Sequence, residues 1–113
     1  MIGKTITKKV KNKNMVGMIF DEQKTKKIIK ESSYVTDGEF LIIVKDVDEC
    51  NITLNSETTE HIVIKALTKV IVKHSGLIDE YYHELVMDKG SSVELCEVEG
   101  VYYIIASDGL KLV

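Results

Sequence analysis

Short segments rich in β-branched residues, separated by turn residues, constrain the fold of this chain more than any other feature. Seven such segments occur from Phe40 onward, the first reading FLIIV and the last VYYIIA. This spacing is typical of a compact domain of short strands and tight turns. We therefore predict an all-β protein whose main domain is a small sandwich or barrel-like fold of short antiparallel strands.

The length of the chain fits one such domain with a short appendage. Its 113 residues are enough for one hydrophobic core. No apolar run reaches the roughly 18 residues of a membrane-spanning helix, so we expect no membrane partner. The chain opens without the apolar run of a secretory signal, and Cys50 and Cys96 are expected to be small buried side chains rather than a disulfide.

Charge divides the chain into two parts. Residues 1–30 carry nine lysines against two acids, a net charge of +7, whereas residues 31–113 carry six lysines against sixteen acids, a net charge of −10. Ends of opposite charge are expected to face different surroundings. We assign residues 1–36 to a basic N-terminal arm or hairpin that anchors the protein, and residues 37–113 to the β-domain.

The lysines of the basic segment are candidates for binding a partner, although a solvated face of a strand pair would carry the same pattern. Every basic residue is lysine, and the absence of arginine argues against specific recognition of nucleic acid. Nonspecific binding to phosphates stays an alternative. The candidate residues are Lys4, Lys8, Lys9, Lys11, Lys13, Lys24, Lys26 and Lys27.

Residues 56–75 admit two interpretations. Ser56 could cap a helix that ends at Gly76. In His61–Lys73, however, seven of the thirteen residues are Ile, Val or Thr, which lose side-chain freedom in a helix and pack well in a sheet. We therefore favour two strands joined by a turn.

Alternation and turn residues place the remaining boundaries. The segments SVELCEV and GVYYIIA are expected to form a hairpin across Glu97–Gly100, with Tyr102 and Tyr103 on opposite faces of the strand. One of these tyrosines would cover the core, and the other could contact a neighbouring subunit. We also predict strands at residues 2–10, 15–20 and 25–30, a connector at 31–38, and turns at 74–82 and 87–92.

Side chains capable of catalysis or metal binding occur, but not in an informative pattern. His61, His74 and His83 do not follow the spacing of a zinc site. The acidic turn Asp46–Glu49 lacks the length and the glycine of an EF-hand loop. Phosphate-binding loops and the GxSxG frame are missing from the sequence. We expect no enzyme activity, no metal and no cofactor.

The stretch from Thr36 to Ala106 resembles small β-domains of phage virion fibres, head fibres and capsid-decoration proteins. Those domains share an order of motifs that runs from an ITL strand to a strand of the type G-x-(W/Y)-Y-I-I. The matching pieces here are Ile52–Leu54, Ile62–Lys65, Val70–Val72, Ser75–Gly76, Ile78–Asp79, Leu85–Met87, Lys89–Leu95 and Gly100–Ile105. The loop at residues 77–82 and the turn at 56–60 depart from the pattern.

The resemblance implies a structural role. Proteins of this kind form homotrimers, so this chain would be a trimeric head fibre or capsid-decoration protein, assembled in the host cytoplasm and located in the virion. Its N-terminal segment would attach it to the major capsid protein or another virion protein. The alternatives are a tail-fibre or baseplate adaptor, and a small phage-encoded intracellular inhibitor or regulator of a host protein.

Overall fold

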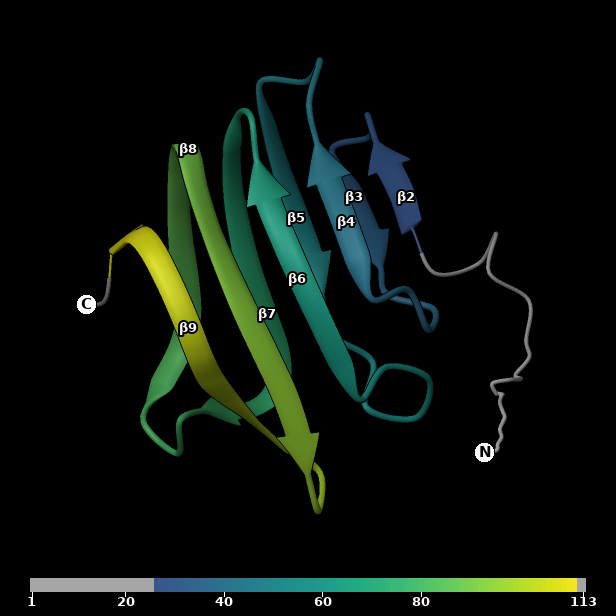
Figure 1. Ribbon diagram of the computed structural model, residues 1–113, viewed down its shortest axis with the longest axis vertical. Helices are drawn as coiled ribbons and strands as arrows, with labels where there is room; N and C mark the ends of the chain where they lie inside the picture. The colour runs from purple at the N-terminus through teal and green to yellow at the C-terminus, as the bar shows by residue number, and fades with distance from the viewer. Residues whose placement is uncertain (1–25, 112–113) are drawn as a thin grey trace.

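The computed structural model describes residues 26–111, which form strands and turns and contain no helix (Figure 1). The chain winds into a β-solenoid, so the all-β prediction is confirmed and the predicted sandwich or barrel is wrong. The strands are β2 (Lys26–Ile29), β3 (Ser33–Val35), β4 (Leu41–Val44), β5 (Glu49–Thr53), β6 (His61–Ala66), β7 (Lys69–Ile78), β8 (Tyr82–Val98) and β9 (Val101–Lys111).

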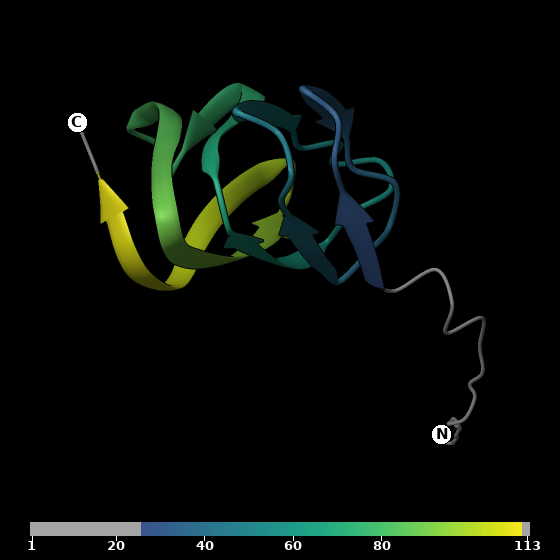
Figure 2. The ribbon, with the colours of Figure 1, turned by 90° about the horizontal axis from the view of Figure 1, so that it is seen from above.

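Parallel strands from successive coils build the two walls of the solenoid. β2, β4 and β6 pair in parallel and form the first wall, and β3, β5 and β7 form the second wall in the same way. Leu41, for example, pairs with Val63 one coil later. Figure 2 shows the two walls facing each other across the interior. Each strand therefore pairs with the strand after next, and the antiparallel arrangement expected for this region is wrong.

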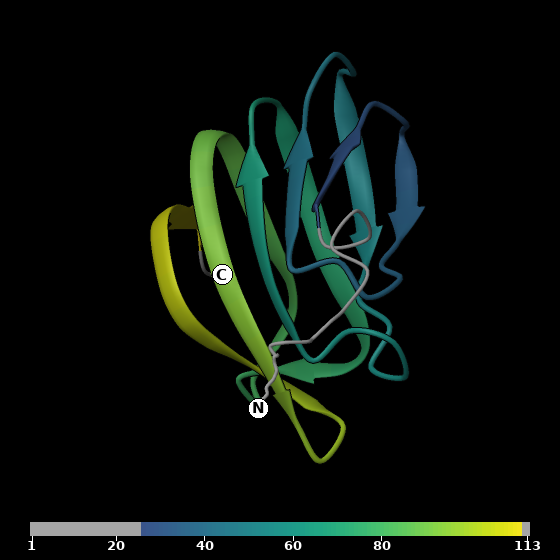
Figure 3. The same ribbon diagram turned by 45° about the vertical axis from the view of Figure 1, so that its right-hand side comes forward.

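The C-terminal end of the solenoid is closed by antiparallel pairing. The first part of β8 pairs with β7 and its last part pairs with β6, so β8 crosses from the second wall to the first (Figure 3). β9 then pairs with β8. The predicted turn at 87–92 is wrong because β8 bends there without ending. Gly90, at φ +97°, and a hydrogen bond of 2.6 Å from the Ser91 hydroxyl to the Asp88 carbonyl accommodate the bend.

Of the other local predictions, some are confirmed and others are wrong in part. Residues 56–75 contain parts of two strands and no helix, and the strand at 25–30 is confirmed as β2. The connector at 31–38 is wrong in part, since β3 lies within it and pairs with β5. β7 continues into the predicted turn and reaches Ile78. The strands expected at residues 2–10 and 15–20 fall outside the described residues.

Two tight turns join the final strands. Asp79 and Glu80 have φ of 57° and 59°, and Glu99 and Gly100 have φ of 53° and 86°. Two consecutive positive φ values match the right-handed twist of a hairpin. The predicted hairpin across Glu97–Gly100 is therefore confirmed.

Alternation along each strand directs one set of side chains into the interior. Ile42 and Val44 are buried while Leu41 and Ile43 face outward, and β6 alternates in the same way. On β2, only Ile29 is buried. Tyr102 heads the largest fully buried side chains. The core is Ile29, Ile42, Val44, Cys50, Ile52, Leu54, Ile62, Ile64, Ala66, Val70, Val72, Ile78, Leu85, Met87, Val93, Leu95 and Tyr102.

Buried threonines hold together two loops at one end of the coils. The Thr36 hydroxyl accepts hydrogen bonds from the backbone amide of Asn55 at 2.9 Å and from the Thr59 hydroxyl at 3.0 Å. The Thr59 hydroxyl in turn accepts the amide of Gly38 at 3.0 Å. Both threonines are 1% exposed. The loop after β3 is thereby fixed to the loop after β5.

Replacing Thr36 by valine is expected to lower the free energy of unfolding by about 2 kcal/mol. The substitution keeps the shape of the side chain but leaves two buried donors without their acceptor. Urea denaturation measures the change. The matched control is Thr53→Val, because Thr53 is exposed and its substitution should alter stability by less than about 0.5 kcal/mol. Equal effects of the two substitutions would contradict a role for the buried hydroxyl.

Candidate interaction surface

The outward side chains of the first wall continue onto β8 and β9 and form one surface, which we call the first outer face. Strand register fixes its rows. One row runs through Lys26, Leu41, Val63, Glu94 and Ala106, and the next through Ile28, Ile43, Lys65, Ser92 and Asp108. Strands that lie far apart in the sequence thereby contribute to a single surface.

The half of this face built on β2 and β4 is apolar and basic. Ile28 is 52% exposed, although it is a large aliphatic side chain. Beside it, Lys26, Lys27, Leu41 and Ile43 complete the lining of a shallow hollow of about 340 Å³. Neighbouring exposed apolar side chains with polar residues around them are typical of surfaces that bind other molecules.

The half built on β8 and β9 is acidic. A second hollow, of about 240 Å³, is lined by residues of β6, β8 and β9 that include Glu94, Ala106 and Asp108. The carboxylate of Glu94 lies 2.5 Å from the Nε2 atom of His61 on the neighbouring strand. The charge of the first outer face therefore changes from basic to acidic along the solenoid.

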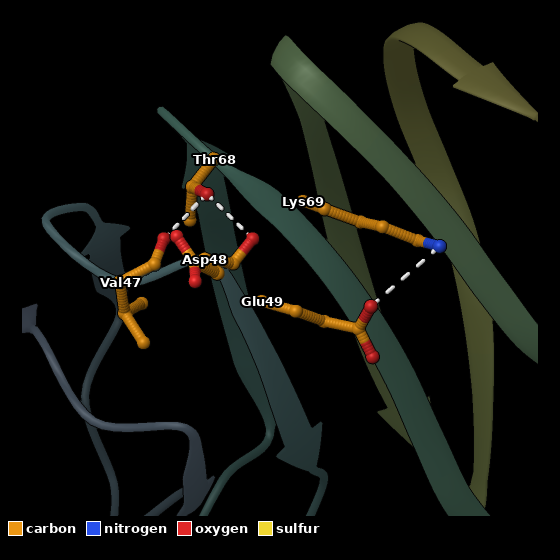
Figure 4. Close-up of polar contacts among 5 residues, drawn as sticks. All are labelled: Val47, Asp48, Glu49, Thr68 and Lys69. Atoms are coloured by element: carbon orange, nitrogen blue, oxygen red, sulfur yellow. Dashed lines mark hydrogen bonds and ion pairs between the residues drawn. The ribbon is translucent and has the colours of Figure 1, made fainter.

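The outward side chains of the second wall form a contrasting surface, the second outer face. Lys69 and Glu49 form an ion pair at 3.6 Å, and the Thr68 hydroxyl donates to the carbonyl groups of Val47 and Asp48 (Figure 4). Both charged side chains are more than 40% exposed, so the pair contributes little to stability. Lys69 and Glu49 thus neutralise each other within this face.

The predicted partner-binding lysines are only partly within the described residues. Lys26 and Lys27 lie on β2, and the Nζ atom of Lys27 is 4.8 Å from the centre of the Tyr34 ring. The remaining six lysines lie outside the described residues. Sequence reasoning missed Ile28, Leu41 and Ile43, which the parallel pairing of β2 and β4 brings together with these lysines.

The two predicted tyrosines lie on opposite faces of β9, as expected. Tyr103 faces outward, and its hydroxyl donates to a carboxylate oxygen of Glu80 at 2.6 Å. Tyr102 faces inward, and its hydroxyl donates to the backbone carbonyl of Thr59 at 2.5 Å. The Tyr102 ring also makes an edge contact with the ring of His74, with centroids 4.8 Å apart. Tyr102 therefore acts inside the protein, and only Tyr103 is accessible to a partner.

Burial and hydrogen bonds raise the pKa values of three tyrosine hydroxyl groups in this protein. Burial raises the pKa of Tyr102 from 10.0 to about 12. Burial and the hydrogen bond to Glu39 raise the pKa of Tyr34, and the hydrogen bond to Glu80 raises that of Tyr103. Each of these tyrosines is held in its neutral form by the folded state.

The stability of the protein is therefore expected to fall as the pH rises from 10 to 12. A folded-state pKa above the unfolded value means that the unfolded chain releases its proton first, so the stabilisation is complete below pH 10 and is lost as the pH approaches 12. Urea unfolding across this interval measures the loss. Tyr102→Phe should show a shallower loss than the parent protein, and an identical slope in both would contradict the assignment.

Among residues 26–111, no group of three or more His, Cys, Asp and Glu side chains is placed to hold a metal ion. Cys50 and Cys96 are both free; Cys50 is buried, as predicted, whereas Cys96 is half-buried on the first outer face. The described residues also include no helix that is long and apolar enough to cross a membrane. We therefore take the first outer face as the candidate interaction site of the described residues.

Comparison with known proteins adds no relative. No protein-family model matches the chain, and no curated protein matches its sequence. The resemblance to phage fibre domains therefore depends on the sequence motifs alone.

Proposed function

We propose that this protein is a non-enzymatic structural component of a phage virion. In this proposal it is a homotrimeric head fibre or capsid-decoration protein, and its basic N-terminal segment attaches it to the major capsid protein or another virion protein. The rigid solenoid would serve as the body of the assembly. The protein would be assembled in the host cytoplasm and located in the virus particle.

The observation that carries the proposal is the division of charge along the chain. Residues 1–30 have a net charge of +7, and the first described strand, β2, starts within this segment at Lys26. Three of the segment's lysines, Lys26, Lys27 and Lys30, therefore belong to the first described coil. Complementary charge guides a protein to an oppositely charged surface and fixes its orientation there. An acidic shell is the partner that the other six lysines of residues 1–30 fit.

The motif order that underlies the resemblance gives separate support. The pieces that match phage fibre domains fall on β5 to β9 and the loops between them. These strands include the antiparallel closure of the solenoid. The sandwich or barrel predicted from the spacing of the strands is wrong, so the support comes from the order of the motifs and not from the architecture.

Mass spectrometry of purified virus particles tests the proposal directly. The protein should be found in intact particles and should remain there after washing at low salt. Charge reversal of Lys4, Lys8, Lys9, Lys11 and Lys13 to glutamate should abolish binding to particles. High salt should also release the protein, because salt screens interactions between exposed charges beyond about 10 Å at 0.1 M.

A matched control separates attachment from general charge effects. Lys73→Glu with Lys89→Glu changes exposed lysines of the acidic part of the chain and should leave particle binding intact. Circular dichroism verifies that both variants keep the β fold. Particles that lack the protein altogether would refute the virion role, and equal loss of binding in both variants would refute attachment through the N-terminal segment.

A further inference from the structure

We propose that the first outer face is the contact between two copies of this chain. In this contact, the half built on β2 and β4 of one copy packs against the half built on β8 and β9 of the other. The inference rests on the self-association part of the proposed function. It identifies the surface through which the copies associate and the way in which the two halves of that surface pair. The sequence motifs give neither. The contact has twofold symmetry and gives a dimer in place of the proposed trimer, so light scattering that finds a trimer would overturn it.

The apolar content of the face calls for a protein partner. Ile28 is 52% exposed and lies in register with Ile43, while Leu41 occupies the neighbouring row. The corresponding outward positions of the second wall hold Ser33, Asn51 and Thr53, with Val35, at 55% exposure, as the one outward aliphatic side chain on β3 and β5. Burying aliphatic side chains is favourable in proportion to the apolar surface removed from water. With three outward aliphatic side chains on β2 and β4, the first outer face therefore gains more from being covered than the corresponding part of the second.

Charge identifies the partner as a second copy. Lys26, Lys45 and Lys65 lie on the strands of the first wall or at their ends, with no acid among the outward residues of β2, β4 and β6. Glu94 and Asp108 provide the acids on β8 and β9. The two halves of one face thus carry opposite charge. Turning a second copy end for end places its acidic half over the basic half of the first.

The two hollows fit the same arrangement. Each half of the face holds one, of about 340 Å³ on β2 and β4 and about 240 Å³ across β6, β8 and β9. A hollow accepts a protruding side chain, and Ile28 at 52% exposure protrudes at the edge of the first. Two copies related end for end bring each half onto its opposite half. One symmetry operation therefore satisfies both.

Other occupants use only part of the surface. Nucleic acid or an anionic membrane would be attracted by the lysines but repelled by Glu94 and Asp108. Phosphates would also leave Ile28, Leu41 and Ile43 without apolar contacts. A second copy engages the basic half, the acidic half and the aliphatic side chains together.

Light scattering of the full chain with a matched pair of substitutions tests the surface. Ile43→Lys places a charge in the apolar half of the first outer face and should reduce the measured mass to that of a single chain, 12.7 kDa. Ile71→Lys makes the same change at a half-buried outward position of the second wall and should leave the assembly unchanged. Circular dichroism establishes that both variants are folded.

Charge exchange provides a second measurement that does not depend on apolar packing. Lys26→Glu and Asp108→Lys should each weaken self-association at least tenfold, and mixing the two variants should restore it between unlike chains. An assembly that withstands Ile43→Lys and both charge changes would overturn this surface while leaving self-association in place. A parent protein that is a monomer at micromolar concentration would overturn both, without bearing on attachment to particles.

Discussion

Ile52→Lys is expected to prevent folding of the solenoid. Ile52 is fully buried on β5, where it pairs with Tyr34 and Val72 of adjacent coils. A lysine there would bury an ammonium group in the hydrophobic core, at a cost of several kcal/mol. Domains of this size are stable by only about 5–15 kcal/mol in total. The variant should therefore be insoluble or lack the β signal in circular dichroism.

The adjacent residue supplies the control. Asn51 lies on the same strand but faces outward and is half-buried, so Asn51→Lys should keep the fold and change stability by less than about 1 kcal/mol. Urea denaturation of both variants measures the difference. If Ile52→Lys unfolded at the same urea concentration as Asn51→Lys, the assignment of inward and outward residues on β5 would be wrong.

The strands themselves could be predicted because alternation is a local property. Ile42 and Val44 alternate with outward residues, and such a pattern specifies a strand with one buried face whatever its neighbours are. Composition also allowed strands to be predicted in His61–Lys73, because its many β-branched residues favour a sheet over the helix that Ser56 could cap. The hairpin at Glu99–Gly100 was predictable because a turn of this type joins strands that are adjacent in sequence.

The choice of partner strand could not be predicted in this way. Leu67 and Thr68 form a short connection that resembles a hairpin turn in sequence, yet they join β6 of the first wall to β7 of the second. Parallel pairing links residues a whole coil apart, such as Leu41 and Val63. No turn residue between them encodes that register. A sandwich and a solenoid therefore share the same local signals.

The same limit explains which parts of the candidate surface were missed. The lysines and the two tyrosines were identified from charge and alternation, which are visible in the sequence. The cluster of Ile28, Leu41 and Ile43 depends on the pairing of β2 with β4 and had no local signal. Acidic residues such as Asp108 join the face only because β9 is added to β8.

Tyr102→Ala is expected to lower the free energy of unfolding by about 3–5 kcal/mol. Removing a large buried aromatic ring loses its apolar contacts and leaves a cavity. The substitution also leaves the Thr59 carbonyl without the hydroxyl that it accepts at 2.5 Å. Tyr102 connects the last strand to the loop before β6, so its loss should loosen the closed end of the solenoid. Urea denaturation measures the change.

Two further substitutions divide the effect of Tyr102 into its parts. Tyr102→Phe keeps the ring and should cost about 1–3 kcal/mol, since only the hydrogen bond to the Thr59 carbonyl is lost. Tyr103→Ala removes a neighbouring ring that faces outward and should cost less than either change at Tyr102. If Tyr103→Ala were as damaging as Tyr102→Ala, the closed end would depend on the outward surface of β9. In that case the hydrogen bond from Tyr103 to Glu80, rather than the buried ring, would be the main link to the turn after β7.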